Sequence, residues 1–156
     1  IESENVERVL IREEVSEREK SLSGVAKQHG VTNYAFFQNA GYRGMYNMNL
    51  AQLRQLKGIN SKRSPLDFMG KDELAANLFR ITQTELKVKQ DGRRGQGYLE
   101  SLAEQVGKQV RQAMLDISGT RPESLPPAED VNTVKKGLKE THKKLKEIDV
   151  PRDNAG

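Results

Sequence analysis

Apolar residues recur at helical spacing along most of the chain, and the pattern is clearest between Asp72 and about Gln90. Leu74, Leu78 and Ile81 follow one another at steps of four and three, which places them on one side of an α-helix. Four further positions widen this stripe: Ala75, Phe79, Thr82 and Leu86. The pattern predicts a central helix whose apolar side packs in the core.

The other side of this central helix is polar. Five residues at steps of about three and four form the stripe: Asn77, Arg80, Gln83, Thr84 and Lys87. If the stripe faces solvent, its donors can contact the phosphates or base edges of a nucleic acid. If it faces inward, it forms a buried polar network that fixes the helix in register. The sequence leaves both interpretations open.

Helical patterns also precede the central helix. Glu, Arg and Lys surround an irregular apolar stripe from about Glu4 to Gln28, which predicts a long first helix. A short aromatic helix is expected to follow and to seed the core through three side chains: Tyr34, Phe36 and Phe37. Two glycines among aromatics then predict a tight loop from Asn39 to Asn47. We interpret Tyr42 and Tyr46 as anchors of this loop on the core, the alternative being stacking on unpaired bases.

Caps, prolines and periodicity define the remaining elements. They are a helix capped by Asn49 over Leu50 to Lys57, a turn over Leu66 to Met69, a flexible basic linker over Asp91 to Gly97, a helix over about Tyr98 to Ile117, an extended segment over Thr120 to Pro127, and a last helix over Val131 to Ile148. We expect the helix after Tyr98 to pack against the central one. Gly107 inside it costs about 1 kcal/mol relative to alanine, which predicts close approach of a neighbouring backbone.

These elements predict an all-α fold, a compact multi-helix domain of about six helices. Residues 1–127 form the helical core, in which a Pro-rich extended segment comes last, and residues 128–156 form a basic C-terminal helix and a frayed tail after Pro151. The sequence opens abruptly at Ile1 with no leader, so we expect it to be a fragment of a longer protein.

Composition limits the class of protein. The absence of cysteine excludes disulfides, thiolate metal sites and cysteine nucleophiles, and is compatible with a reducing compartment. No apolar run approaches the roughly 20 residues that span a bilayer. These features favour a cytoplasmic protein without membrane contact.

Basic residues gather in the middle of the chain, although the net charge is only +4. Several lie in predicted loops or at helix ends beside the polar stripe: Lys57, Lys62, Arg63, Arg93 and Arg94. We predict that they add salt-dependent attraction to a nucleic acid or another anionic partner. The lysines of the last helix are interpreted as a solvated face, because charge runs on helices are usually that.

A catalytic role finds little support. Asp67, Glu85 and Lys87 match the residue types of magnesium-dependent nucleases, but Glu85 and Lys87 lie on a helix and point about 200° apart. His29 and His142 are widely separated and are expected to be solvated or to cap helices. The glycines between Asp91 and Gly97 lack the lysine and hydroxyl residue of a phosphate-binding loop. We therefore predict a protein that is not an enzyme and uses neither metal nor cofactor.

Four stretches resemble a known family. They are Phe37–Tyr46 (FQNAGYRGMY), Met69–Glu85 (MGKDELAANLFRITQTE), Val106–Arg111 (VGKQVR) and Gly119–Pro126 (GTRPESLP). In this order they are similar to the C-terminal region of the DNA-damage-inducible protein D (DinD) family, and the resemblance spans most of the chain. Three residues before Val106, where the family often has a histidine, this sequence has Ala103, so no catalytic role is carried over for that histidine.

The resemblance implies a missing N-terminal domain related to phage antirepressors and an SOS-linked role in DNA metabolism, most concretely antagonism of RecA recombinase filaments. Our leading hypothesis is a noncatalytic module that binds single-stranded or duplex DNA, or a recombinase–DNA filament, through the basic central face. One alternative is an oligomerisation module that joins copies of the full-length protein through exposed apolar sides of its long helices. A magnesium-dependent nuclease is a third, weaker alternative.

Overall fold

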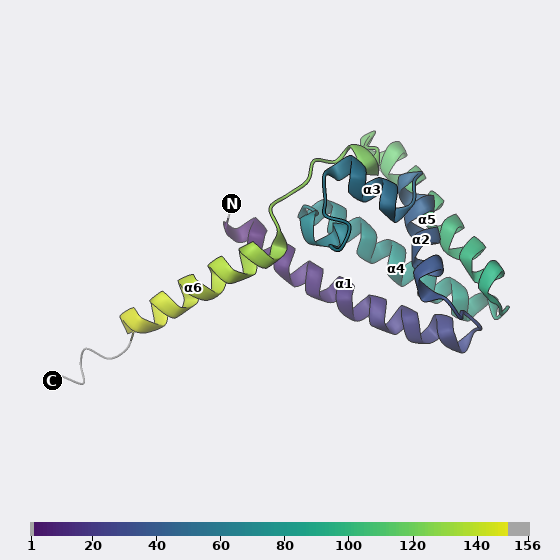
Figure 1. Ribbon diagram of the computed structural model, residues 1–156, viewed down its shortest axis with the longest axis horizontal. Coiled ribbons are helices and arrows are strands. Elements are labelled where there is room, and N and C mark those ends of the chain that lie inside the picture. The colour runs from purple at the N-terminus through teal and green to yellow at the C-terminus, as the bar shows by residue number, and fades with distance from the viewer. Residues whose placement is uncertain (1, 150–156) are drawn as a thin grey trace.

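The computed structural model of the protein describes residues 2–149, which form six α-helices and no β-strand (Figure 1). The helices are α1 (Glu2–Gln28), α2 (Tyr34–Tyr46), α3 (Leu50–Lys57), α4 (Lys71–Asp91), α5 (Gln96–Ser118) and α6 (Val131–Asp149), with short 3-10 turns η1 (Pro65–Phe68) and η2 (Pro122–Ser124). The predicted all-α fold is confirmed. The frayed end predicted after Pro151 lies outside the described residues.

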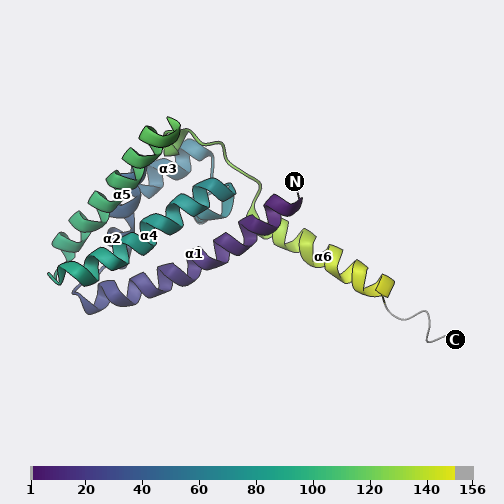
Figure 2. The ribbon, with the colours of Figure 1, turned by 180° about the vertical axis from the view of Figure 1, so that it is seen from behind.

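Two helix pairs build the body of the molecule. Helix α4 packs along α1, α2 packs on α5, and contacts between α4 and α5 join the pairs (Figures 1 and 2). The expected contact of the helix after Tyr98 with the central helix is present, but the main partner of α5 is α2. Within residues 2–149 no helix combines the length and apolarity needed to cross a membrane.

Capping side chains mark the starts of two helices, and a glycine marks the end of one, where the sequence predicts. Asn49 caps α3 by accepting from the backbone N–H of Gln52 at 2.8 Å, and the Gln52 side chain returns the bond to the Asn49 N–H. Gly58 ends α3 in the left-handed conformation. Asn33 caps α2 by accepting from the N–H of Phe36 at 3.1 Å. The predicted caps are confirmed. They could be predicted from the sequence because a capping side chain bonds free backbone N–H groups of its own helix end and needs no partner from elsewhere in the fold.

The loop predicted between Asn39 and Asn47 is wrong, because α2 continues as a helix through Gly41 and Gly44 to Tyr46. The glycines serve close packing on α5. A Cβ on Gly107 would lie 2.5 Å from the carbonyl oxygen of Gly41, and a Cβ on Gly44 would overlap the carbonyl oxygen of Glu104. The close approach predicted at Gly107 is therefore confirmed, with α2 as the neighbouring backbone.

The aromatic side chains of α2 divide between the core and the surface. Phe37, Tyr42 and Tyr46 are fully buried, so the two tyrosines pack in the core as predicted, but they belong to helix α2 and not to a loop. Phe36 is 61% exposed, and its predicted place in the core is wrong. It precedes Phe37 by one residue, a rotation of about 100° around the helix, and near the start of α2 this rotation carries the Phe36 ring to the solvent side.

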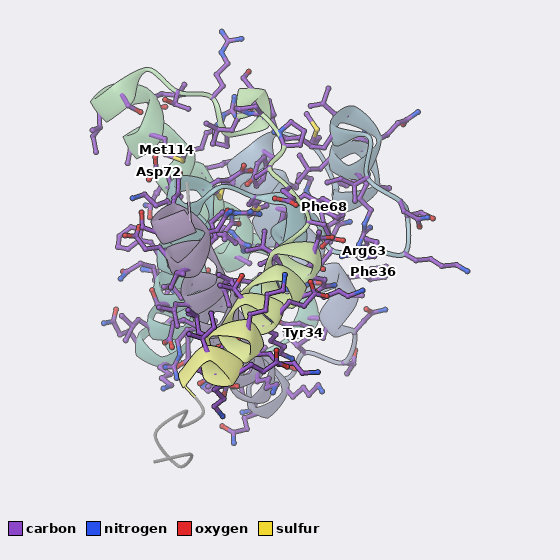
Figure 3. The ribbon with its side chains drawn as sticks, turned by 90° about the vertical axis from the view of Figure 1, so that its left-hand side faces the viewer. Tyr34, Phe36, Arg63, Phe68, Asp72 and Met114 are labelled. Atoms are coloured by element: carbon purple, nitrogen blue, oxygen red, sulfur yellow. The ribbon has the colours of Figure 1, made fainter. Side chains whose placement is uncertain are left out.

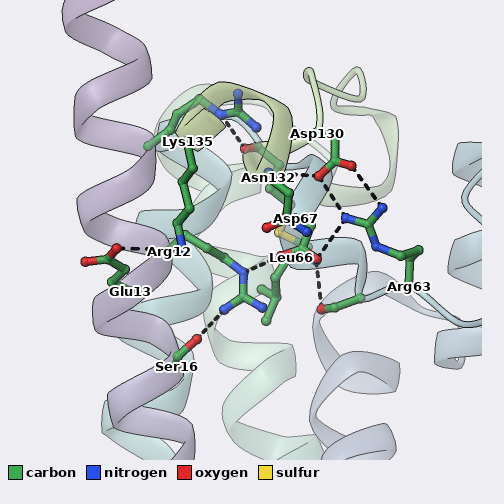
Figure 4. Close-up of polar contacts among 12 residues, drawn as sticks. Arg12, Glu13, Ser16, Arg63, Leu66, Asp67, Asp130, Asn132 and Lys135 are labelled. Atoms are coloured by element: carbon green, nitrogen blue, oxygen red, sulfur yellow. Dashed lines mark hydrogen bonds and ion pairs between the residues drawn. The ribbon is translucent and has the colours of Figure 1, made fainter. Parts of the chain in front are cut away.

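Helix α6 leaves the body beside the first half of α1 and projects away from it (Figures 1 and 2). Four charged side chains fix its base (Figure 4). Arg63 donates to both carboxylate oxygens of Asp130 at 2.8 and 2.9 Å and to Asp67 at 3.3 Å, and Arg12 donates to Asp67 at 2.8 Å. Arg63 also lies 5.0 Å above the ring of Phe68 (Figure 3).

Buried Arg8 ties the segment before α6 to the body. Its guanidinium donates to the carbonyl oxygen of Met69 at 2.9 Å and to that of Glu129 at 2.6 Å. These two carbonyls lie 60 residues apart in the sequence. One arginine of α1 therefore holds the entry to α4 and the entry to α6 together.

The packing of α2 on α5 predicts opposite effects for two glycine substitutions. Gly44→Ala should lower the free energy of unfolding by at least about 2 kcal/mol, because the new methyl group meets backbone that cannot turn away. Gly24→Ala is the matched control, since a Cβ there has no neighbour within 4 Å, and it should raise the free energy of unfolding by about 0.5–1 kcal/mol. Urea unfolding followed by circular dichroism measures both. Unchanged stability of Gly44→Ala would contradict the packing described.

Candidate functional site

The polar stripe of α4 does not form one surface. Asn77, Arg80 and Thr84 are buried, with exposed fractions of 0%, 3% and 1%. Gln83 is partly exposed and Lys87 is exposed. The interpretation as a buried network therefore holds for the first three residues, and in this fold they cannot reach a macromolecular partner as predicted. An Arg80→Ala variant would test folding rather than binding.

The buried arginine is held without a carboxylate in direct contact. Its guanidinium donates to Asn77 Oδ1 at 3.1 and 3.3 Å and lies 4.6 Å above the ring of Tyr42. Space for it comes from Gly41, because a Cβ at that position would lie 2.5 Å from Arg80 Nη1. Thr84 donates to the Arg80 carbonyl at 2.7 Å. Nε and Nη2 of Arg80 and the Thr84 hydroxyl thus have hydrogen-bond partners, and the face of the Tyr42 ring adds a contact that favours a buried cation.

The network continues to a buried carboxyl group. Asn77 Nδ2 donates to Tyr46 Oη at 3.0 Å, and Tyr46 in turn donates to Glu73 Oε2 at 2.5 Å. Burial raises the pKa of the Glu73 carboxyl, although the bond from Tyr46 opposes the shift. Burial also raises the pKa of Tyr46, so its hydroxyl stays a donor. The chain of contacts links α2 to α4 through the core.

Burial of the polar stripe turns part of the predicted apolar face outward. Phe79 is 54% exposed and Leu86 is 46% exposed, whereas sequence reasoning placed both toward the core. Leu74, Ile81 and Val88 remain buried. The buried side of α4 thus combines apolar residues with the polar network, and no pattern in the sequence of α4 alone indicates this.

A groove between α4 and α5 collects the outward residues. Its volume is about 210 Å³, and its walls are Phe79, Gln83, Leu86, Lys87 and Gln90 from α4 and Val106, Gln109 and Val110 from α5. Two predicted binding residues, Gln83 and Lys87, therefore meet an exposed aromatic ring in one concave surface. Sequence reasoning missed Phe79, Gln90 and Gln109; exposed amides and an aromatic side chain near basic residues would have been the available signal.

The turn from α4 to α5 carries two more predicted residues, Arg93 and Arg94, both exposed. The predicted flexible linker is shorter and is tied down. The Gly95 N–H donates to the carbonyl of His29 at 2.9 Å, and the Gln96 side chain accepts from the N–H groups of Thr32 and Asn33 at 2.8 and 3.0 Å. The α4–α5 turn therefore lies against the α1–α2 turn at the lower right of Figure 1.

Arg93 makes contacts at this end of the molecule and stays exposed, as does Arg94. Tyr98 donates to Asp91 at 2.7 Å and this bond lowers the pKa of Asp91, while Arg93 lies over the Tyr98 ring at 5.0 Å and 3.6 Å from Asp91. Exposed Lys27, at the end of α1, adds a charge that sequence reasoning missed. We define the basic turn as four residues: Lys27, Lys87, Arg93 and Arg94.

The other predicted basic residues lie elsewhere. Lys57 donates to the carbonyl of Leu125, and Arg63 is engaged by Asp130 and Asp67. Lys62 is exposed beside them. These three residues come before α4 in the sequence, whereas Arg93 and Arg94 come after it, and the 21 residues of α4 span about 30 Å. The structure does not bring the two predicted groups together.

The residues considered for catalysis are engaged in structural contacts. Asp67 bonds Arg12 and Arg63, and Glu85 lies 3.3 Å from Lys89 near the other end of α4. His29 lies at the end of α1 with Nδ1 2.8 Å from the carbonyl of Val25, as expected of a capping histidine. Among residues 2–149 no three His, Asp or Glu side chains lie together as metal ligands would.

The raised pKa of Glu73 predicts how stability depends on pH. The folded state holds this proton more tightly than the unfolded state, so the group stabilises the fold below its unfolded pKa and loses this contribution as pH rises. Glu73→Gln keeps the acceptor for Tyr46 and cannot ionise, so it should exceed the parent in free energy of unfolding at pH 7. The difference should shrink toward pH 4.

Urea unfolding of both proteins across this pH range makes the measurement. Glu147→Gln, an exposed position on α6, is the control and should show no such trend. A Glu73→Gln variant that loses stability as pH rises just as the parent does would contradict the assignment.

Comparison with known proteins agrees with the resemblance seen in the sequence. The profile of the DinD C-terminal domain family matches residues 2–134. The DNA damage-inducible protein D of Escherichia coli strain K12 is 40% identical over 146 residues, which cover 90% of this chain and 53% of that relative. The chain thus spans about half the length of the relative. This chain, whose helical body is matched along nearly its whole length, belongs to the DinD C-terminal domain family.

Proposed function

We propose that this chain is a noncatalytic module of a DNA-damage-response protein and that it binds single-stranded DNA through the α4–α5 groove and the basic turn. The name of the relative, DNA damage-inducible protein D, supports the biological setting. The observation that carries the binding proposal is the meeting of Phe79, Gln83 and Lys87 in one groove.

The groove and the turn offer different parts of the required chemistry. Lys27, Arg93 and Arg94 supply charges for phosphates, which give affinity without sequence preference. The Phe79 ring offers a face on which an unpaired base can stack, and the glutamine amides of the groove can meet base edges. From Phe79 to Asp91, where α4 ends, is 12 residues, about 18 Å along the helix axis, which is room for several nucleotides.

Single-stranded DNA is favoured over duplex because of the exposed aromatic ring. In a duplex the bases are already stacked on one another, and a side chain such as Phe79 gains contact only by unstacking them. A recombinase–DNA filament is the alternative partner. It would use the same basic turn, with protein contacts replacing those to bases.

Loss of the two arginines of the turn should weaken DNA binding. Fluorescence anisotropy with a labelled oligothymidine across a salt series compares Arg93→Ala/Arg94→Ala with the parent. We expect roughly tenfold weaker binding and a salt slope smaller by about 1.4, the value for two lost phosphate contacts on a single strand. Lys20→Ala/Lys108→Ala removes the same charge from side chains that are 77% and 62% exposed elsewhere, and should change binding much less.

Equal losses in both double variants would mean that only net charge matters. No binding by the parent at low salt would refute the direct proposal, and binding that appears only when recombinase coats the DNA would favour the filament instead.

The aromatic ring makes a second prediction. Phe79→Ala should weaken binding to single-stranded DNA by about 1–3 kcal/mol, the usual contribution of one stacked base. The affinity for duplex DNA, which we expect to be lower in the parent, should stay almost unchanged. Leu56→Ala is the control, because Leu56 is 57% exposed on α3. The same anisotropy titration measures both variants. An unaltered single-strand affinity in Phe79→Ala would remove base stacking from the proposal.

A further inference from the structure

Helix α6 carries an apolar stripe that continues beyond the body. Six residues follow one another at alternating steps of three and four: Val131, Val134, Leu138, Thr141, Leu145 and Ile148. Val131 and Val134 are buried at the base of α6. Leu145 is 53% exposed and Ile148 is 56% exposed. The spacing is that of a two-helix seam, in which such residues meet a second helix.

A groove runs beside the base of the same helix. It is lined by Asn5, Glu129, Thr133, Val134, Gly137, Leu138 and Thr141 and has a volume of about 420 Å³. At Gly137 a Cβ would meet nothing within 4 Å, so the surface is open there. The groove therefore offers apolar contact close to Val134 and Leu138, where large side chains of another helix can lie.

Charge selects the orientation of a second helix. The outer part of α6 carries exposed lysines: Lys139, Lys143, Lys144 and Lys146. Beside its base, the lining of a cavity of about 730 Å³ along α1 includes Glu13, Glu14 and Glu17, and also Arg12, which is paired with Asp67. Lys135 of the same chain already reaches Glu13 at 3.7 Å, as Figure 4 shows. Side-by-side parallel helices would bring lysines together, whereas antiparallel helices bring them to the glutamates.

We propose that α6 pairs with α6 of a second copy of this chain in antiparallel orientation. Leu145 and Ile148 of each copy then lie in the groove at the base of the other copy's α6. The outer lysines of each helix lie beside the glutamates of the other copy's α1. The contact is symmetric and closed, so it produces a dimer and not a filament.

This dimer goes beyond the proposed DNA binding and does not require it. Helix α6 and the basic turn lie at opposite ends of the molecule (Figure 1). Pairing through α6 therefore leaves both basic turns free and directed away from each other. Two DNA-binding surfaces on one particle would raise the affinity for long strands over short ones.

Sedimentation equilibrium of the whole chain tests the proposal between about 1 and 200 μM. The parent should be a dimer at the upper concentrations. Leu145→Asn/Ile148→Asn should weaken dimerisation roughly 100-fold, because it removes the apolar contacts of both copies. Ile117→Asn is the matched control, since Ile117 is 85% exposed on α5, and it should dimerise like the parent. Circular dichroism of each variant reports whether the body remains helical.

Orientation is tested separately. The chain has no cysteine, so Lys146→Cys introduces a single site for a spin label. Full antiparallel overlap of residues 131–148 separates the two labelled positions by about 20 Å along the axis, whereas parallel pairing places them side by side. Electron–electron distance measurement distinguishes the two arrangements.

Three results would overturn the proposal: a parent that stays monomeric at 200 μM, a dimer that Leu145→Asn/Ile148→Asn leaves intact, and labels that lie side by side. None of them bears on the anisotropy experiment with short oligonucleotides, so failure of the dimer and failure of DNA binding are distinguishable.

Discussion

The contact that the rest of the structure depends on is the direct approach of the α2 backbone to the α5 backbone. Gly41 and Gly44 on one helix and Gly107 on the other leave no side chain between them, and an added Cβ at Gly107 would lie 2.5 Å from the Gly41 carbonyl oxygen. Close contact of this kind fixes both the distance and the register of the pair. It also brings Tyr42 and Tyr46 into the interior, where α4 packs next to them.

The same glycines explain how a charged residue can occupy the core. Gly41 leaves the space that Arg80 Nη1 fills, and Asn77 and the Tyr42 ring provide its polar contacts. A buried cation is expensive unless its donors are satisfied, so the network admits one rotation of α4 and disfavours others. That rotation places Phe79 and Lys87 outside, in the groove beside α5. The buried network thereby determines the candidate binding surface without taking part in it.

The two basic regions of the chain have different surroundings. The basic turn is held by backbone contacts between two connections, so its charges sit on a fixed platform. The lysines of α6 lie instead on a helix that is anchored at its base, where Arg63 bonds Asp130 and where Val131 and Val134 are buried. Bonding from Arg63 lowers the pKa of Asp130, which keeps this carboxylate ionised and paired. The basic turn and the projecting helix α6 are therefore separate surfaces, and each can bind a partner of its own.

The sequence by itself determined the helices, most of their ends and the family, because periodicity, caps and glycines act within a few residues. Asn49, Gly58 and the spacing of Leu74, Leu78 and Ile81 required no knowledge of neighbours. Only the tertiary structure decided that Gly41 and Gly44 lie inside a helix, since glycine suits a loop and a close helix contact equally well. It also decided which side of α4 faces inward. The residues Asn77, Arg80 and Thr84 are the same whether they face water or face a core that offers hydrogen-bond partners. In this fold α2 supplies such partners, and it lies more than thirty residues earlier in the sequence.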